Sequence, residues 1–194
     1  ALALADRDGF AARRQASEAA GKLRGLGLSN YVESPVGYPR ERAVVEVKDG
    51  TVQVIVGTQS SGQGHETSFV QVISDQLGVP MEQVRLITGD SHVLTEGGGT
   101  HSDRSMRLAG TAMVFGCEAV IRRGLAIAAH LLEAAAADVE FANGSYRVTG
   151  TDRSLGIFEV AAAATGTHIP ESLRGPLTET GDVPDRLPAY PTGS

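Results

Sequence analysis

One loop between two regular elements constrains the fold of this chain more than any other feature. Residues 57–67 read Gly-Thr-Gln-Ser-Ser-Gly-Gln-Gly-His-Glu-Thr, follow an alternating apolar stretch over 52–56, and open a segment of helical periodicity. The pattern predicts a strand, a loop of small residues and a helix N-terminus. Unpaired N–H groups and the positive end of the helix dipole make such a junction a natural anion site. The alternative is a connection that only needs its glycines.

A second loop of the same kind follows. Residues 97–105 read Gly-Gly-Gly-Thr-His-Ser-Asp-Arg-Ser, between the strand-like run 84–87 and another helical segment. Two such loops would bind one extended polyanion between them, so we expect the loops to lie within roughly 15 Å of each other at one end of a sheet. Neither loop is a P-loop or a dinucleotide fingerprint. His65 and His101 lie on the loops and are candidates for contact with a cofactor or a neighbouring domain.

The remaining pattern predicts an α+β fold, a mixed sheet with helices packed on one face. The expected helices are residues 6–23, 64–77, 103–137 and 157–164, the last capped by Ser154, and the expected strands are residues 43–47, 51–57, 84–87, 139–142 and 146–149. Asp49-Gly50 and Asn143-Gly144 are expected hairpin turns. We expect a lead-in helix and linker over 1–40, the α+β domain over 41–165, and an irregular tail over 166–194 that leads to a missing C-terminal part.

Composition narrows the classes of partner. The net charge is −6 and no cluster of Lys or Arg occurs, which disfavours nucleic acid. No apolar run approaches the ~20 residues that span a bilayer, and no signal-peptide pattern opens the chain. The single cysteine, Cys117, allows no internal disulfide, so we expect a cytoplasmic protein.

The two loops together resemble those of a known family. The run Gly-Gln-Gly-His-Glu-Thr at 62–67, an apolar helix, Gly89-Asp90, Gly99-Thr100 and Arg104-Ser105 at this spacing resemble the large subunit of molybdenum hydroxylases. These are the relatives of xanthine dehydrogenase, aldehyde oxidase and aerobic carbon monoxide dehydrogenase. The resemblance extends from about Gly25 to the last residues. It implies that the α+β fold is part of a molybdenum cofactor-binding domain.

The resemblance also implies residue roles. The implied cofactor-binding residues are Gly62, Gln63 and Gly64 against the metal and pterin, and Thr100, Ser102, Asp103, Arg104 and Ser105 around the pyrophosphate or attached nucleotide. Gln63 is the implied catalytic residue, expected to hydrogen-bond an oxygen ligand of the metal. No side chain is expected to ligate the metal, because the pterin dithiolene holds it. The implied cofactor is molybdopterin, with the cytosine dinucleotide as a candidate form, and the isolated fragment is expected to lack it.

The implied activity belongs to a larger assembly. Relatives oxidise an aldehyde, a purine-type heterocycle or carbon monoxide with oxygen from water, and pass electrons to iron–sulfur and flavin subunits or domains. Their general base lies in a Gly-Glu motif C-terminal to these loops, and this sequence contains no Gly-Glu dipeptide. The chain also begins at Ala1 without Met. We therefore expect an excised, inactive domain whose first partners are the remaining domains of its subunit; the alternative is a naturally split small subunit.

Two departures from the family pattern favour a different function. Ser61 stands where many relatives have Gln, and Asp103 stands where many have Ser. A carboxylate at Asp103 repels a pyrophosphate unless it points away or caps the helix. The alternative function is a non-catalytic binding or scaffold domain that kept the fold and lost the cofactor.

Overall fold

The computed structural model describes residues 2–31 and 37–183, which belong to two separate units. The smaller unit holds helices α1 (Leu2–Ala5) and α2 (Phe10–Ala19). The prediction of one helix over 6–23 is therefore wrong in extent. Asp6 adopts a positive φ of 45° and interrupts the helical path between α1 and α2. Gly21, with a φ of 70°, lies just after the end of α2. No residue of α2 is buried.

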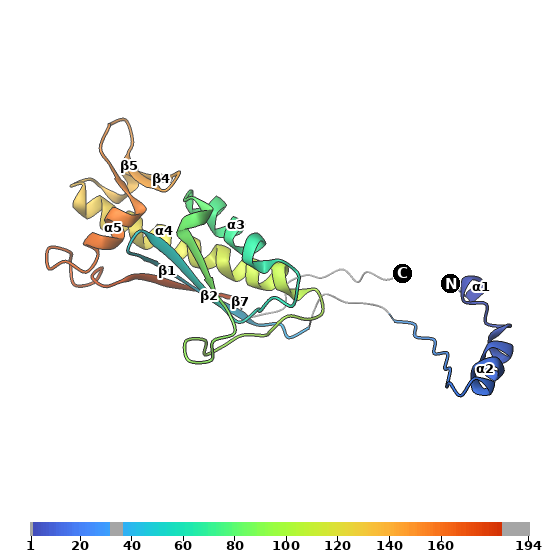
Figure 1. Cartoon of the computed structure of the whole chain (residues 1–194). Helices are drawn as coiled ribbons and strands as arrows, with labels where there is room; N and C mark the ends of the chain where they lie inside the picture. The colour runs from blue at the N-terminus through green and yellow to red at the C-terminus, as the bar shows by residue number, and fades with distance from the viewer. Residues whose placement is uncertain (1, 32–36, 184–194) are drawn as a thin grey trace. The chain divides into compact units, whose positions relative to one another are not determined.

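The larger unit is built on a four-stranded mixed sheet (Figure 1). Its strands are β1 (Glu41–Lys48), β2 (Thr51–Val56), β3 (Val84–Ile87) and β7 (Leu177–Val183), in the order β3-β2-β1-β7. β1 is antiparallel to β2 and β7, and β2 is parallel to β3. The β1–β2 hairpin turns at Asp49 and Gly50, both with positive φ, so the predicted turn is confirmed.

One face of this sheet is covered by helices. Figure 1 shows α4 (Thr111–Leu131) running along the strands, and α3 (His65–Leu77) contacts β3 and α4. Along β1 and β2 every second side chain is fully or almost fully buried, namely Ala43, Val45, Val47, Val52, Val54 and Val56. The residues between them are half-buried or exposed. The predicted α+β class, with a mixed sheet and helices on one face, is confirmed.

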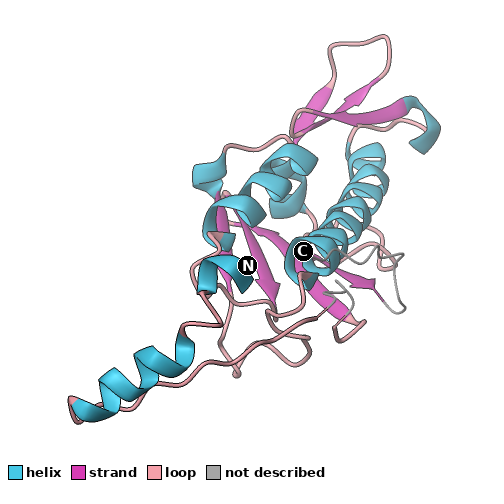
Figure 2. Cartoon of the chain, turned by 90° about the vertical axis from the view of Figure 1, so that its right-hand side faces the viewer, coloured by secondary structure: helices cyan, strands magenta, loops and turns pink. Residues whose placement is uncertain are grey.

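A smaller sheet lies apart from the main one (Figure 2). It contains β4 (Val139–Ala142), β5 (Ser145–Val148) and β6 (Ser154–Gly156), and α5 (Ile157–Ala163) follows it. Asn143 and Gly144, both at positive φ, form the predicted turn. Ser154 lies in β6 and is not the helix cap. The Gly156 N–H instead donates to the Glu159 carboxylate at 2.7 Å.

Two other predictions are corrected. The helix expected over 103–137 is a π-helical segment, η2 (Ser105–Gly110), followed by α4, which ends at Leu131. Glu133 takes a left-handed φ of 48°, and Arg153 donates to the Leu132 carbonyl at 2.7 Å, so the chain turns and the helix end is capped. The tail expected to be irregular from 166 contains β7, an edge strand of the main sheet that pairs with β1. Residues 184–194 lie outside the described residues. Two single-turn 3₁₀ segments, η1 (Met81–Gln83) and η3 (Ala136–Asp138), complete the fold. No described helix combines the length and hydropathy needed to cross a bilayer.

Candidate functional site

The first loop (residues 57–64) connects β2 to the N-terminus of α3. Gly62 and Gly64 have φ values of 117° and 75°, a region that L side chains rarely adopt. Space is open where a Cβ would stand at either glycine. Gly64 is the N-cap of this 13-residue helix and supplies no side-chain cap. Its carbonyl oxygen accepts from the Thr67 N–H at 3.0 Å, so the N–H groups that an outside acceptor can use are those of His65 and Glu66.

The second loop (residues 97–104) leads into η2. Gly99 has a φ of 74°, and the next non-glycine residues in the left-handed region are Ser102 at 48° and Asp103 at 52°. Two consecutive L-residues in this region cost on the order of 1–3 kcal/mol each. Such a conformation persists only where the surroundings hold it, and it is concentrated at functional sites. The second loop is therefore held in a shape that its own sequence does not favour.

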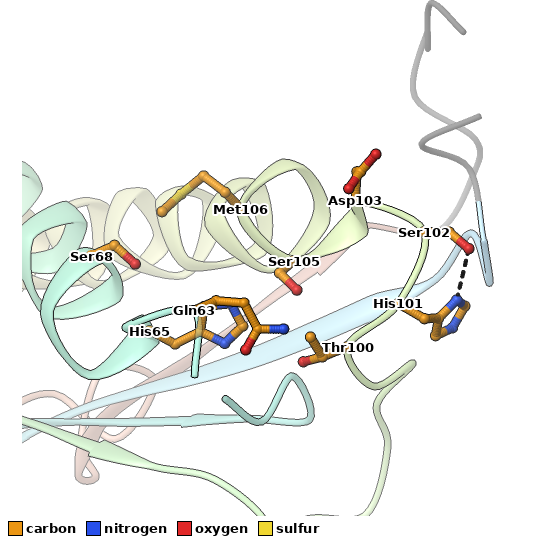
Figure 3. A pocket seen from close by; sticks show the side chains of 9 residues that line it. All are labelled: Gln63, His65, Ser68, Thr100, His101, Ser102, Asp103, Ser105 and Met106. Carbon is orange, nitrogen blue, oxygen red and sulfur yellow. Dashed lines mark hydrogen bonds between the residues drawn. The ribbon is translucent and has the colours of Figure 1, made fainter. Parts of the chain in front are cut away.

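His101 contributes to holding that shape. Its Nε2 lies 3.2 Å from the Gly98 carbonyl oxygen, and its Nδ1 lies 3.2 Å from the Ser102 hydroxyl (Figure 3). A carbonyl only accepts, so in the neutral ring Nε2 donates and Nδ1 accepts from Ser102. The hydroxyl proton of Ser102 is thus used within the loop, and its oxygen keeps acceptor capacity.

The two loops lie against each other. A Cβ on Gly57 would overlap the Cα of Gly97, and the Thr100 hydroxyl donates to the Gln59 carbonyl oxygen. Together with the start of α3 and η2 they surround an open pocket of about 470 Å³. The pocket is lined by Gln63, His65, Ser68, Thr100, His101, Ser102, Asp103, Ser105 and Met106. The predicted convergence of the two loops is confirmed.

The predicted site residues do not all face this pocket. Gln63, Thr100, Ser102, Asp103 and Ser105 line it, and Gly62 and Gly64 flank Gln63. In Figure 3 the side chains of Gln63, Thr100 and Ser105 face one space, whereas the Asp103 carboxylate is directed away from them. Gln63 Oε1 accepts from the Ser61 N–H at 2.5 Å, so its Nε2 remains as the donor for a ligand.

Arg104 is the predicted site residue that turns away from the pocket. It is fully buried, and its Nη1 lies 2.7 Å from Oε2 of Glu41, which is also buried. Further guanidinium donors bond the carbonyl oxygens of Tyr38 at 2.9 Å, Arg40 at 2.5 Å and Gly99 at 2.5 Å. Four of its five N–H donors are therefore used inside the protein. Its guanidinium is not placed to contact a ligand in the pocket.

His65 is the most distinctive side chain in the pocket. It is only 4% exposed, and its ring stacks on Phe69 with centroids 4.4 Å apart and planes 6° from parallel. Its buried Nδ1 has no hydrogen-bond partner among the described residues. A buried polar atom without a partner is costly, and a ligand that hydrogen-bonds it removes the cost.

Some residues of the site carried no sequence signal as site residues. Ser68 lies on the first turns of α3, where helical spacing from Gly64 and His65 would have placed it on the same side. Met106 lies in η2, which the sequence predicted as ordinary helix. Glu41 is 63 residues from Arg104, and nothing local marks the pair.

The chemistry of the pocket fits a polar, anionic ligand held by uncharged donors. Its lining includes hydroxyl, amide and imidazole groups but no Lys or Arg side chain among the described residues. The one carboxylate of the lining, that of Asp103, is directed away from Gln63, Thr100 and Ser105 (Figure 3). The open space at Gly62, Gly64 and Gly99 admits a ligand close to the backbone, where N–H groups bind phosphate. The described residues contain no group of three or more His, Cys, Asp or Glu able to hold a metal ion.

Comparison with known proteins identifies the class. The family model of the molybdopterin cofactor-binding domain matches residues 1–191, so the chain belongs to this family. It is thus a cofactor-binding domain of the kind found in molybdenum-dependent oxidoreductases.

Individual relatives agree. The chain is 34% identical over 144 residues to the 6-hydroxypseudooxynicotine dehydrogenase complex subunit gamma of Paenarthrobacter nicotinovorans, covering 74% of this chain and 18% of that one. It is 30% identical over 185 residues to the carbon monoxide dehydrogenase large chain of Afipia carboxidovorans, covering 89% of this chain and 23% of that one. The solved carbon monoxide dehydrogenase of Oligotropha carboxidovorans superposes with a TM-score of 0.74 at 25% identity, over 98% of this chain and 26% of that chain. The chain spans about a fifth to a quarter of the length of these relatives.

Proposed function

We propose that the pocket between the two loops holds the phosphate-bearing part of a molybdopterin cofactor in the large subunit of a molybdenum hydroxylase. The observation that carries the proposal is the convergence of two glycine-containing loops, the second of them strained at Ser102 and Asp103, on one pocket at the N-terminus of α3. The N–H groups of His65 and Glu66 at the start of α3 and the Ser105 hydroxyl are the proposed phosphate ligands. The Thr100 hydroxyl already donates its proton to the Gln59 carbonyl oxygen and holds the two loops together.

Residues of this chain would bind and orient the cofactor. Gln63 is our candidate for contact with its molybdenum end through Nε2, the donor that the loop itself does not use. His65 would satisfy its buried Nδ1 against a polar atom of the cofactor. Arg104 would act at a distance, by holding the second loop. When bound, the cofactor supplies the redox-active molybdenum.

The parent subunit would oxidise an aldehyde, a purine-type heterocycle or carbon monoxide with oxygen from water. Iron–sulfur and flavin subunits or domains would accept the electrons, and the general base would come from another part of the subunit. The cytosine dinucleotide form of the cofactor and a cytoplasmic location remain predictions of the sequence.

A scaffold domain without cofactor is the second candidate, because the lining of the pocket includes the carboxylate of Asp103, although this carboxylate is directed away from Gln63, Thr100 and Ser105. Metal and pterin analysis of the purified full-length subunit separates the two. We expect about one molybdenum and one pterin per subunit, with cytidine nucleotide released on hydrolysis. A folded subunit from a host that makes the cofactor, yet without molybdenum and pterin, would support the scaffold.

A further inference from the structure

A single carboxylate oxygen joins the two loops of the pocket. Oε2 of Glu41 accepts from the Thr58 hydroxyl at 2.8 Å in the first loop and from the Gly98 N–H at 3.2 Å in the second. It also accepts from Nη1 of Arg104 at 2.7 Å, at the end of the second loop. Glu41 is 2% exposed and the Thr58 and Arg104 side chains are fully buried, so water does not compete for these bonds.

Arg104 extends this connection to the segment before β1. Its guanidinium donates to the carbonyl oxygens of Tyr38 and Arg40, and also to Gly99 within the second loop. The guanidinium is planar, so the directions of its donors are fixed relative to one another. Gly98 lies directly over it, because a Cβ there would overlap the guanidinium nitrogens. The left-handed residues Ser102 and Asp103 immediately precede this anchor.

We propose that Glu41 is a positioning residue for the cofactor, fixing the two loops at the separation that the cofactor requires. The inference rests on the proposed function of the pocket. Glu41, Thr58 and Arg104 are not among the residues that line the pocket, so they act through the loops and not by contact. Glu41 accepts a hydrogen bond from each of the two loops. An ion pair with Arg104 that served only stability would not need to bond both loops.

The mildest test changes Thr58 in the full-length subunit and leaves the ion pair intact. Thr58→Val removes the hydroxyl donor at nearly constant shape, and Thr58→Ser keeps it. A hydrogen bond to a charged group corresponds to a change of about tenfold or more in an equilibrium constant. We expect Thr58→Val to bind the cofactor about tenfold more weakly than wild type, and Thr58→Ser to keep an affinity within about twofold of wild type. The measurement is the molybdenum and pterin content that remains after dilution and gel filtration.

A second pair of variants separates positioning from stability. Glu41→Gln leaves a buried guanidinium without its counter-charge, which lowers the melting temperature, whereas Glu41→Gln combined with Arg104→Met removes both charges and restores much of it. If the buried pair of Glu41 and Arg104 positions the loops, the double variant regains much of its melting temperature but not its cofactor. If the double variant recovers both its melting temperature and its cofactor content, the proposal is overturned, because lower stability alone would then explain the loss of cofactor in Glu41→Gln.

Glu179→Gln is the matched control. Glu179 pairs with Arg123 at 3.1 Å, between β7 and α4, and neither residue lines the pocket. Because this pair is partly exposed, the variant is expected to lower the melting temperature less than Glu41→Gln does, while keeping normal cofactor content. A wild-type subunit without molybdenum and pterin refutes the proposed function itself. A loaded wild type beside a normally loaded Thr58→Val variant refutes only the role of Glu41.

Discussion

Gly181 in β7 tests how closely α4 is packed on the sheet. A Cβ added at Gly181 would overlap the Ala112 carbonyl oxygen and the Gly116 nitrogen, both in the backbone of α4. Gly116 is itself in close contact, since a Cβ there would lie 2.8 Å from Cγ2 of Val45. No side-chain rotation relieves such an overlap, so in Gly181→Ala the helix must move away from β1 and β7.

The expected cost follows from two opposing effects. Overpacking a well-packed core costs about 1–3 kcal/mol, and a backbone overlap belongs at the upper end of that range. Replacing Gly with Ala returns about 0.4–1 kcal/mol by restricting the unfolded chain. We therefore expect Gly181→Ala to lower the free energy of unfolding by about 2 kcal/mol, or the melting temperature by about 4–8 °C for a chain of this size.

Urea unfolding of the purified 194-residue chain, followed by far-ultraviolet circular dichroism, measures this effect. Thr180→Ala is the matched control, because Thr180 is exposed on the same strand and its change is expected to stay within about 0.5 kcal/mol. A Gly181→Ala variant as stable as the control would refute the close packing of α4 on β7.

Three further predictions concern the site and the core. Gln63→Ala in the full-length subunit is expected to slow turnover or weaken metal retention. Glu66→Gln is expected to leave the chemistry largely intact, because Glu66 is an exposed first-turn residue of α3. An inactive, fully metallated Glu66→Gln enzyme beside a normal Gln63→Ala enzyme would reverse these roles. His65→Phe is expected to keep the stack on Phe69 and the melting temperature, since it removes a buried atom without a partner, yet to lower pterin content; unchanged pterin content would exclude His65 from binding. Burial raises the pKa of the Cys117 thiol from 9.0 to about 12, with a smaller contribution from Glu118, so the unfolded thiol ionises first and the free energy of unfolding is expected to decrease as pH rises from 9 toward 12. If the free energy of unfolding of Cys117→Ala decreases equally steeply over this pH range, the Cys117 thiol is not the source of the effect.

Local patterns in the sequence predicted much of the fold. Asp49-Gly50 and Asn143-Gly144 each supply the two consecutive positive φ angles that a tight hairpin needs, which few other residue pairs provide. The strands flanking Asp49-Gly50 alternate because one face is buried, and α3 begins directly after Gly64 and ends before Gly78. In these places the signal and the structure it determines lie within a few residues of each other.

The strand β7 escaped prediction because tertiary contacts hide its alternation. Its inward positions are Leu177, Glu179, Gly181 and Val183, since they pair with the buried residues of β1 or contact α4. Glu179 is accommodated there by Arg123, and Gly181 is needed for the close approach of α4. A polar residue and a glycine on the buried face make the segment look irregular in sequence.

The candidate site likewise has parts that local sequence patterns predict and parts that depend on residues distant in sequence. The two loops and their convergence could be predicted, because small residues before a helix are a local feature. The inward turn of Arg104 could not, because it depends on Glu41, which is distant in sequence. An arginine in a phosphate-binding loop is expected to face its ligand. This one faces the protein because the buried Glu41 carboxylate and three backbone carbonyl oxygens bond its guanidinium.

The central claim is that the pocket between the two loops holds the cofactor. An experimental structure of the full-length subunit, purified from a host that makes the molybdenum cofactor, tests it most directly. We expect cofactor density in this pocket, with a phosphate group within hydrogen-bond distance of the His65 and Glu66 N–H groups of α3 and of the Ser105 hydroxyl. Cofactor bound elsewhere in the subunit, or another segment of the subunit filling the pocket, would contradict it.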